Sequence, residues 1–313
     1  MDLGHPPLGV LVVVDMEGIS GINHWHQVTG GFQEFEQHGR IQVTGDVNAA
    51  VRGLKAAGVN KIRVVDNHGS GGPSQNVIPE KLEQGAELYN GPNIVTRLGE
   101  AADETMNAAV FLGFHAMADT PDAFMPHTRT IEPRIRINGE PVGETAITAY
   151  FLGERNIPVI MATGDQALAR EAQAALPGIE VAQVKTSTRK NTSGCLPPEL
   201  ARGRIQEAAM RSVSRIREMK PLVAKRPITV QISYLTKDET DLVDGMPGSR
   251  RIDPNTLSYT TDQWNNVEDF INTASRLVSQ IRIRKLLRAM SKLEGVSQIQ
   301  EELIKKDIDE WLK

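Results

Sequence analysis

The feature that most constrains the fold is the alternation of short apolar runs with amphipathic helical stretches. The first run, Leu8 to Val14, has no polar side chain and is rich in valine, which is typical of a strand covered on both faces. Residues 45–58 then place apolar side chains on one helical stripe and end in glycine. Because parallel strands need such crossover helices, the pattern predicts an α/β fold with a wound, mainly parallel sheet and helices on both faces. Further strands are expected at 61–65, 108–112, 157–161 and 181–184, and further helices at 144–155, 166–176 and 197–219.

The last third of the chain predicts a smaller α+β part. Residues 227–234 are typical of a strand, residues 238–261 of a loop, and residues 262–291 of a long amphipathic helix. Ser297 and Gln300 fit a capping box that opens a last helix. We therefore expect an α/β domain at 1–190 that carries the candidate site, a smaller α+β domain at 191–290, and a helical tail at 291–313.

The composition indicates which partners and which cellular compartment are expected. The net charge is −4, whereas proteins that bind phosphates over an extended surface usually carry a basic excess, so no nucleic-acid partner is expected. The single cysteine, Cys195, excludes an intrachain disulfide and a zinc site of several thiolates, and it fits a cytoplasmic protein. The first apolar run is far shorter than the ~20 residues of a spanning helix, and the N-terminus lacks the positive flank of a signal peptide, so no membrane partner is expected.

Acidic and imidazole side chains follow several of the expected strands, at the edge where wound sheets bind ligands. All seven histidines lie in the first 127 residues. A hairpin is expected at 135–142, because Asn138-Gly139 suits a type I′ turn, and it places one more carboxylate after it. The candidate site residues at these strand ends are Asp15, Glu17, His68, His115 and Glu144.

Each of these residues has an ordinary structural role when taken alone. An isolated Asp caps helices or closes turns, a histidine after a strand is commonly a hydrogen-bonded loop residue, and Glu144 suits the first turn of a helix. Together, clustered carboxylates repel one another unless a cation lies between them. Carboxylates mixed with neutral imidazoles are ligands that suit zinc, manganese or cobalt. The residues alone leave a metal site and a structural polar network equally open.

Motifs at 14–21, 66–68, 112–116, 125–127 and 141–144, followed by shorter ones at 163–165, 184–186, 195–197 and 246–248, occur in the order of one known family. On these motifs the chain resembles the DppA-like zinc D-aminopeptidase family over about residues 8–285. The resemblance implies two zinc ions per subunit, with manganese or cobalt as substitutes. It implies that Asp15 bridges both ions, that Glu17 and His68 complete one site and His115 and Glu144 the other, and that His127 is catalytic.

The resemblance also implies an activity and an assembly. The expected enzyme is a metal-dependent aminopeptidase that hydrolyses the N-terminal amide bond of short peptides or amino-acid amides and prefers D-amino acids. A water activated by two metal ions would attack, assisted by His127 as a proton carrier or as a nucleophile. The expected assembly is a homo-oligomer, in the form of a ring. Pro126 before His127 and the extension at 286–313 depart from the family pattern.

Two other functions are consistent with parts of the sequence. Asp15-Met16-Glu17-Gly18 is similar to the first motif of haloacid-dehalogenase-type phosphatases, but that chemistry needs no histidines at other strand ends. A non-catalytic metal-binding protein would explain the five ligands and leave His127 without a role.

Three remaining features have weaker interpretations. His24-Trp25-His26 fits an exposed loop better than a pocket wall. Lys185 at a strand end is expected to meet substrate or to pair with a surface carboxylate, and Cys195 is expected to pack.

Overall fold

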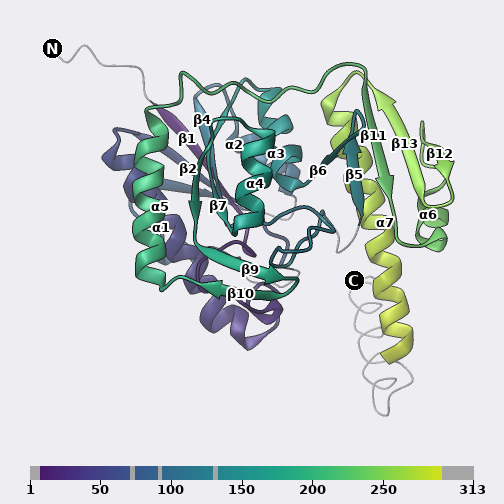
Figure 1. The fold of residues 1–313 in the computed structure, drawn as a ribbon, viewed down its shortest axis with the longest axis horizontal. Helices are drawn as coiled ribbons and strands as arrows, with labels where there is room; N and C mark the ends of the chain where they lie inside the picture. The colour runs from purple at the N-terminus through teal and green to yellow at the C-terminus, as the bar shows by residue number, and fades with distance from the viewer. Residues whose placement is uncertain (1–7, 71–74, 91–93, 130–132, 291–313) are drawn as a thin grey trace, which may run out of the picture.

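The computed structural model describes residues 8–70, 75–90, 94–129 and 133–290, and its centre is a six-stranded parallel sheet (Figure 1). The strands lie in the order β3-β2-β1-β4-β7-β8. Every residue of the central strand β1 is buried, as the unbroken apolar run predicts. The bounds are β1 (Gly9–Val14), β2 (Lys61–Asp66), β3 (Ala86–Tyr89), β4 (Ala108–Leu112), β7 (Val159–Gly164) and β8 (Glu180–Gln183).

Five helices cover the two faces of this sheet, which confirms the predicted α/β class (Figure 1). One face is covered by α1 (Arg40–Ala56) and α5 (Pro198–Val213), which pack against each other. The other face carries α2 (Ile94–Ala101), α3 (Glu144–Gly153) and α4 (Gln166–Ala175). The first helix begins earlier than predicted, because a π-helical turn at Phe35–Gly39 leads directly into it.

The strand order fixes where a ligand can bind. The chain moves from β1 outward through β2 to β3, then returns to place β4 on the other side of β1 and continues outward through β7 to β8. The connections after β1 and after β4 therefore leave in opposite directions and open a crevice at the carboxyl ends of these two strands. This switch point lies where the sequence places its acidic and imidazole residues.

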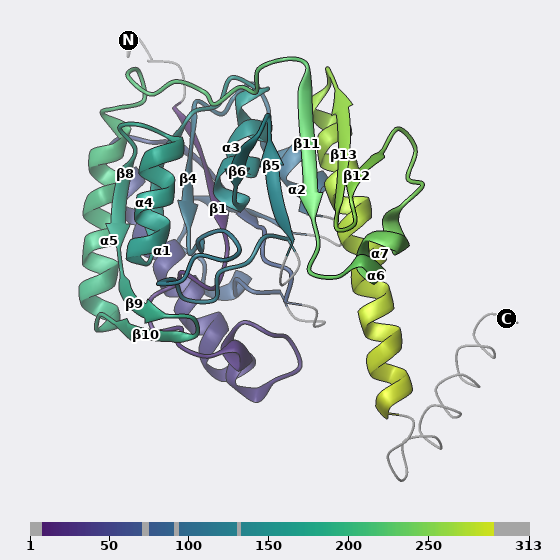
Figure 2. The same cartoon turned by 45° about the vertical axis from the view of Figure 1, so that its right-hand side comes forward.

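A second sheet of five antiparallel strands stands beside the first, in the order β12-β13-β11-β5-β6 (Figure 2). The predicted hairpin is confirmed as β5 (Arg134–Ile137) and β6 (Glu140–Val142), with Asn138 and Gly139 both at positive φ. It pairs with β11 (Ile228–Ser233) from the last third of the chain. The long helix α7 (Trp264–Met290) packs against β11 and β13 and also contacts α3.

The predicted loop at 238–261 is wrong. This segment forms α6 (Lys237–Val243), β12 (Arg250–Asp253) and β13 (Thr256–Thr261). The strands β12 and β13 lie toward the outer edge of the second sheet and are mostly polar, with Leu257 as their one apolar core residue, so they give no apolar run that could signal a strand. The division at residue 190 stays a prediction, and the expected last helix lies outside the described residues.

A short two-stranded hairpin, β9 (Lys185–Arg189) and β10 (Thr192–Cys195), follows β8 directly. Figure 1 shows it below the central sheet, on the side where the parallel strands end. Within the described ranges, no helix combines the length and the apolar character that crossing a membrane requires.

Candidate metal centre

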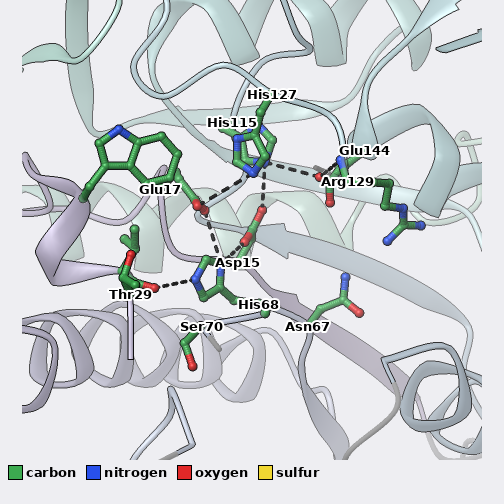
Figure 3. A pocket seen from close by; sticks show the side chains of 13 residues that line it. Asp15, Glu17, Thr29, Asn67, His68, Ser70, His115, His127, Arg129 and Glu144 are labelled. Atoms are coloured by element: carbon green, nitrogen blue, oxygen red, sulfur yellow. Dashed lines mark hydrogen bonds and ion pairs between the residues drawn. The ribbon is translucent and has the colours of Figure 1, made fainter. Parts of the chain in front are cut away.

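The structure brings all six predicted site residues to one cavity of about 260 Å³ at the switch point (Figure 3). Asp15 and Glu17 follow β1, His68 follows β2, and His115 follows β4. The other two come from elsewhere: Glu144 is the first residue of α3 after the β5–β6 hairpin, and His127 belongs to the loop that joins β4 to that hairpin.

Two glycines allow the loops after β1 and β4 to lie in direct contact. The amide of Gly18 donates to the carbonyl of Gly113 at 2.7 Å. A Cβ at Gly18 would lie 2.1 Å from the carbonyl oxygen of Phe114. Gly113 has φ +71°, and a Cβ there would lie 2.3 Å from the carbonyl oxygen of Asp15. This close approach brings the two carboxylates after β1 beside the histidine after β4.

The carboxylate of Asp15 lies between two groups of side chains. Its Oδ1 is 2.9 Å from Nδ1 of His68, which is also 3.4 Å from Oε2 of Glu17. Its Oδ2 is 3.5 Å from Nε2 of His115, which is 3.7 Å from Oε1 of Glu144. Each oxygen of Asp15 therefore faces a different imidazole and carboxylate pair (Figure 3).

Main-chain carbonyls hold one nitrogen of each imidazole and turn the other toward the carboxylates. Nε2 of His68 donates to Val28 O at 2.8 Å, and Nδ1 of His115 donates to Ala116 O at 3.0 Å. Nδ1 of His127 donates in the same way to Met125 O at 2.8 Å. When these rings are neutral, their second nitrogens carry free lone pairs that face the cavity, which is the arrangement found behind metal-ligating histidines.

The donor set fits a divalent metal of the zinc type. Oε2 of Glu17 is buried and makes no hydrogen bond apart from its 3.4 Å ion-pair contact with Nδ1 of His68, and a bound cation would satisfy it. The donor atoms form two groups, and within each group they all lie within 4.8 Å of one another. The first group is Asp15, Glu17 and His115, and the second is His115, His127 and Glu144. His127 therefore has two geometrically open roles, as a metal ligand or as a reacting group.

The protonation of the cluster is set by burial and by its own charges. Burial and the neighbouring charge of Glu17 raise the pKa of Asp15 to about 6. Burial alone would lower the pKa of His115, but the charges of Asp15 and Glu144 raise it to about 9. The pKa of His127 is lowered by burial and by the charge of His115. Without a metal, His115 holds a proton that a cation must displace, whereas His127 stays neutral near pH 7.

His127 packs closely on the centre. Its ring stacks on that of His115 with centroids 3.8 Å apart and an angle of 12° between the planes. Its Nε2 is 4.0 Å from Oε1 of Glu17. The ring of Trp25 lies on another side at 5.9 Å. His127 is thus fixed between an aromatic wall and the carboxylates.

Several cavity residues were missed or misjudged from the sequence. Trp25 lines the cavity, although the sequence predicts an exposed loop there. The segment Trp25–Gln27 forms a short 3-10 helix in which Trp25 and His26 are half-buried, and only His24, its N-cap, is exposed. Arg129 was missed: its amide donates to Oε1 of Glu144 at 2.6 Å, and its Nη2 lies 3.4 Å from Glu268 on α7. Its position two residues after His127 is the one sequence signal that could have marked it. The other lining residues not predicted are Val28, Thr29, Asn67, Gly69 and Ser70.

Comparison with known proteins decides the family. The model of the peptidase family M55, described as D-aminopeptidase, matches residues 8–273. The chain belongs to this family. The assignment confirms the expected enzyme class, a peptidase, and it replaces the phosphatase alternative, whose motif is a short local similarity.

Two relatives within the M55 family are similar over most of their length. The D-aminopeptidase of Bacillus subtilis strain 168 is 31% identical over 237 residues, which cover 75% of this chain and 85% of the relative. The solved structure described as the Zn-dependent D-aminopeptidase DppA from Bacillus subtilis, a self-compartmentalizing protease, superimposes with a TM-score of 0.82. It is 27% identical in sequence, and the match covers 87% of this chain and 98% of that one.

Proposed function

We propose that the chain is a zinc-dependent aminopeptidase that removes a D-amino acid from the N-terminus of short peptides or amino-acid amides. The observation that carries the proposal is the position of Asp15 between two imidazole and carboxylate pairs, in a chain of the M55 family. A single cation would need only one such pair, and the buried Oε2 of Glu17 makes no hydrogen bond beyond its 3.4 Å contact with Nδ1 of His68, which supports a role in holding a cation.

Two sets of residues would hold the metal ions. Glu17 and His68 with one oxygen of Asp15 form the first set, and His115 and Glu144 with the other oxygen form the second. Zinc held there would lower the pKa of a water molecule toward neutrality and would polarise the carbonyl of the scissile amide, and manganese or cobalt would do the same. The protein contributes the orientation of these side chains, through the carbonyls of Val28 and Ala116.

His127 would handle the proton in this reaction. Its Nδ1–H is held by the carbonyl of Met125, so that Nε2 is the nitrogen free to act. From its position beside Glu17, Nε2 can accept a proton from the attacking water and then deliver it to the departing amine. Direct attack by the same nitrogen on the scissile carbonyl is the alternative role.

The size of the cavity supports a small substrate. About 260 Å³ lies near the lower end of the roughly 300–1,000 Å³ of small-molecule sites. It admits the end of a short peptide or an amino-acid amide, with Trp25 as an apolar wall. The preference for D-residues is proposed from the described activity of the relatives.

We extend the proposal to assembly and location. The DppA structure is described as a self-compartmentalizing protease, which supports a homo-oligomer for this chain, built as a ring that would restrict access to short peptides. The single cysteine supports a cytoplasmic location.

A paired assay tests the activity. Protein purified without chelator is given D- and L-alanine p-nitroanilide and p-nitrophenyl phosphate, before and after metal removal and reloading with zinc. We expect amide hydrolysis with D preferred over L, lost without metal and restored by zinc. Hydrolysis of the phosphate ester alone would overturn the proposal, and metal binding without turnover of any substrate would favour a non-catalytic metal protein.

A further inference from the structure

Lys185 is a buried cation beside the candidate centre that the proposed reaction does not use. It is the first residue of β9, its side chain is 1% exposed, and it does not line the cavity. Among the described residues, its ammonium group forms no ion pair, and the charges of Asp46, Asp165 and Glu17 act on it only from a longer distance. Neither sequence interpretation holds, because Lys185 reaches neither the cavity nor the surface.

The ammonium group of Lys185 binds the main chain of the loop after β1. Its Nζ donates to the carbonyl oxygens of Glu17 and Ile22, each at 2.7 Å. The first of these carbonyls belongs to a candidate metal ligand itself. The two bonds therefore fix both ends of the turn that carries the Glu17 carboxylate.

The same ammonium group also contacts the loop after β4. Nζ lies 4.8 Å from the centroid of the Phe124 ring, in a cation–π contact. The amide of Phe124 is held in turn by Asp165, which caps α4, at 2.7 Å. Phe124 lies on the segment between His115 and His127, so one buried charge lies between the two loops that supply most of the centre.

The burial of this charge needs a reason. Taking an ammonium group out of water costs free energy, and a methionine or leucine would fill the same space without that cost. What an apolar side chain cannot do is donate hydrogen bonds to the carbonyls of Glu17 and Ile22. Ser20, in the same loop, is held by a different residue, because its amide and hydroxyl groups donate to Asp46 on α1. The side chain that holds the carbonyl of Glu17 is that of Lys185.

We propose that Lys185 is a positioning residue for the metal centre: its ammonium group holds the carbonyl of Glu17 and so directs the Glu17 carboxylate toward His68 and Asp15. This inference rests on the proposed function, because it takes Glu17 as a zinc ligand. It predicts an asymmetric effect. The zinc site of Glu17 and His68 depends on Lys185, whereas the site of His115 and Glu144 depends on it much less.

Lys185→Met tests the proposal, because methionine keeps the length and packing of the side chain and removes both hydrogen bonds. Zinc is titrated into the metal-free full-length protein in competition with a chromophoric chelator. We expect one zinc per subunit to bind about 10–100-fold more weakly, as when an outer-shell partner of a ligand is lost, and the other to bind as in the unmodified protein. Lys55→Met is the matched control, because Lys55 also donates to a backbone carbonyl, that of Gln84 at 2.8 Å, outside the centre.

Two further measurements separate positioning from simple support of the fold. The melting temperature of the metal-free variant measures the structural contribution alone, so a lower melting temperature with both zinc affinities within twofold of normal would overturn the proposal. In a Glu17→Ala background, Lys185→Met should have no further effect on zinc affinity, and an undiminished effect there would also overturn it. Should Lys185→Met fail to fold, Lys185→Gln retains a donor and is expected to show an intermediate loss, and an unchanged affinity would count against the proposal. Failure of the unmodified protein to bind zinc would instead refute the proposed function.

Discussion

Asp15 has the most demanding position of any single residue in the molecule. It is buried at the end of the central strand, its two oxygens face different side-chain pairs, and burial with the charge of Glu17 raises its pKa to about 6. A carboxylate in this position is stable in its charged form only when cations or protonated histidines neutralise it. The proposed role of Asp15 as a bridge between two metal ions should therefore be visible in the metal content of variants.

We predict that Asp15→Ala loses both zinc ions, whereas Glu144→Ala loses mainly one. In the proposed centre the carboxylate of Asp15 would bridge both cations, and without it their mutual repulsion would be uncompensated. Metal analysis of the purified variants gives the answer. Asp122→Ala is the control, because Asp122 pairs with Arg170 on the surface and is expected to leave the metal content unchanged. Equal metal content in Asp15→Ala and the unmodified protein would refute the bridge.

The second prediction at this scale concerns His127. If it moves a proton and holds no metal, His127→Ala should keep near-normal zinc content and melting temperature, while turnover falls about 10²–10⁴-fold. A nucleophilic role would give a larger fall and an acyl-enzyme that can be trapped in the unmodified protein. Loss of one zinc from the variant would instead place His127 among the ligands with His115 and Glu144. Full metal content with near-normal turnover would remove it from the catalytic residues.

At the scale of the elements, the loops after β1 and β4 determine whether the centre forms. The positions of the candidate residues after strand ends predicted that their side chains would lie close together, because the carboxyl ends of parallel strands meet at one edge of a sheet. The contact between the two loops was not predictable, because it depends on backbone atoms of Gly18 and Gly113 that meet only after the sheet has assembled.

Gly113→Ala tests this contact against a matched glycine. Both Gly113 and Gly58 have positive φ, but a Cβ at Gly58 meets nothing within 4 Å, whereas at Gly113 it would lie 2.3 Å from Asp15 O. Gly58→Ala should therefore cost about 1 kcal/mol of backbone strain, and Gly113→Ala clearly more, with weakened zinc binding. Urea unfolding and zinc titration measure both effects. Equal losses of stability with normal zinc affinity would show that the two loops can separate without consequence.

The elements that the sequence missed share a physical cause. Unbroken apolar runs predict buried strands such as β1 and β4. The strands β3, β12 and β13 are short or mostly polar, so their sequences are typical of loops. Arg129 and Glu268 are 139 residues apart, so no local pattern connects them. Lys185 was misread for a related reason: its partners are backbone carbonyls of a distant loop, which carry no sequence signal.

At the scale of the whole molecule, the second sheet contributes to the centre of the first. The β5–β6 hairpin pairs with β11 and leads directly into Glu144 at the start of α3. Arg129 links α7 to the carboxylate of Glu144, because its side chain contacts Glu268 on α7 and its amide donates to Glu144. Figure 2 shows the C-terminal half of α7 extending beyond both sheets.

We predict that the full-length chain is a homo-oligomer in light scattering. Removal of residues 292–313, whose sequence carries an apolar stripe, should weaken assembly more than it lowers turnover per subunit. Size-exclusion chromatography with light scattering, followed by kinetics on the separated species, measures both quantities. A monomeric full-length chain would contradict the proposed assembly.

The most direct test of the two-metal centre is an anomalous-difference map at the zinc edge from crystals of zinc-loaded protein. We predict two peaks per subunit, about 3.5–4 Å apart, one among Asp15, Glu17 and His68 and the other among Asp15, His115 and Glu144. A single peak, or a peak coordinated by His127 in place of Asp15, would contradict the assignment.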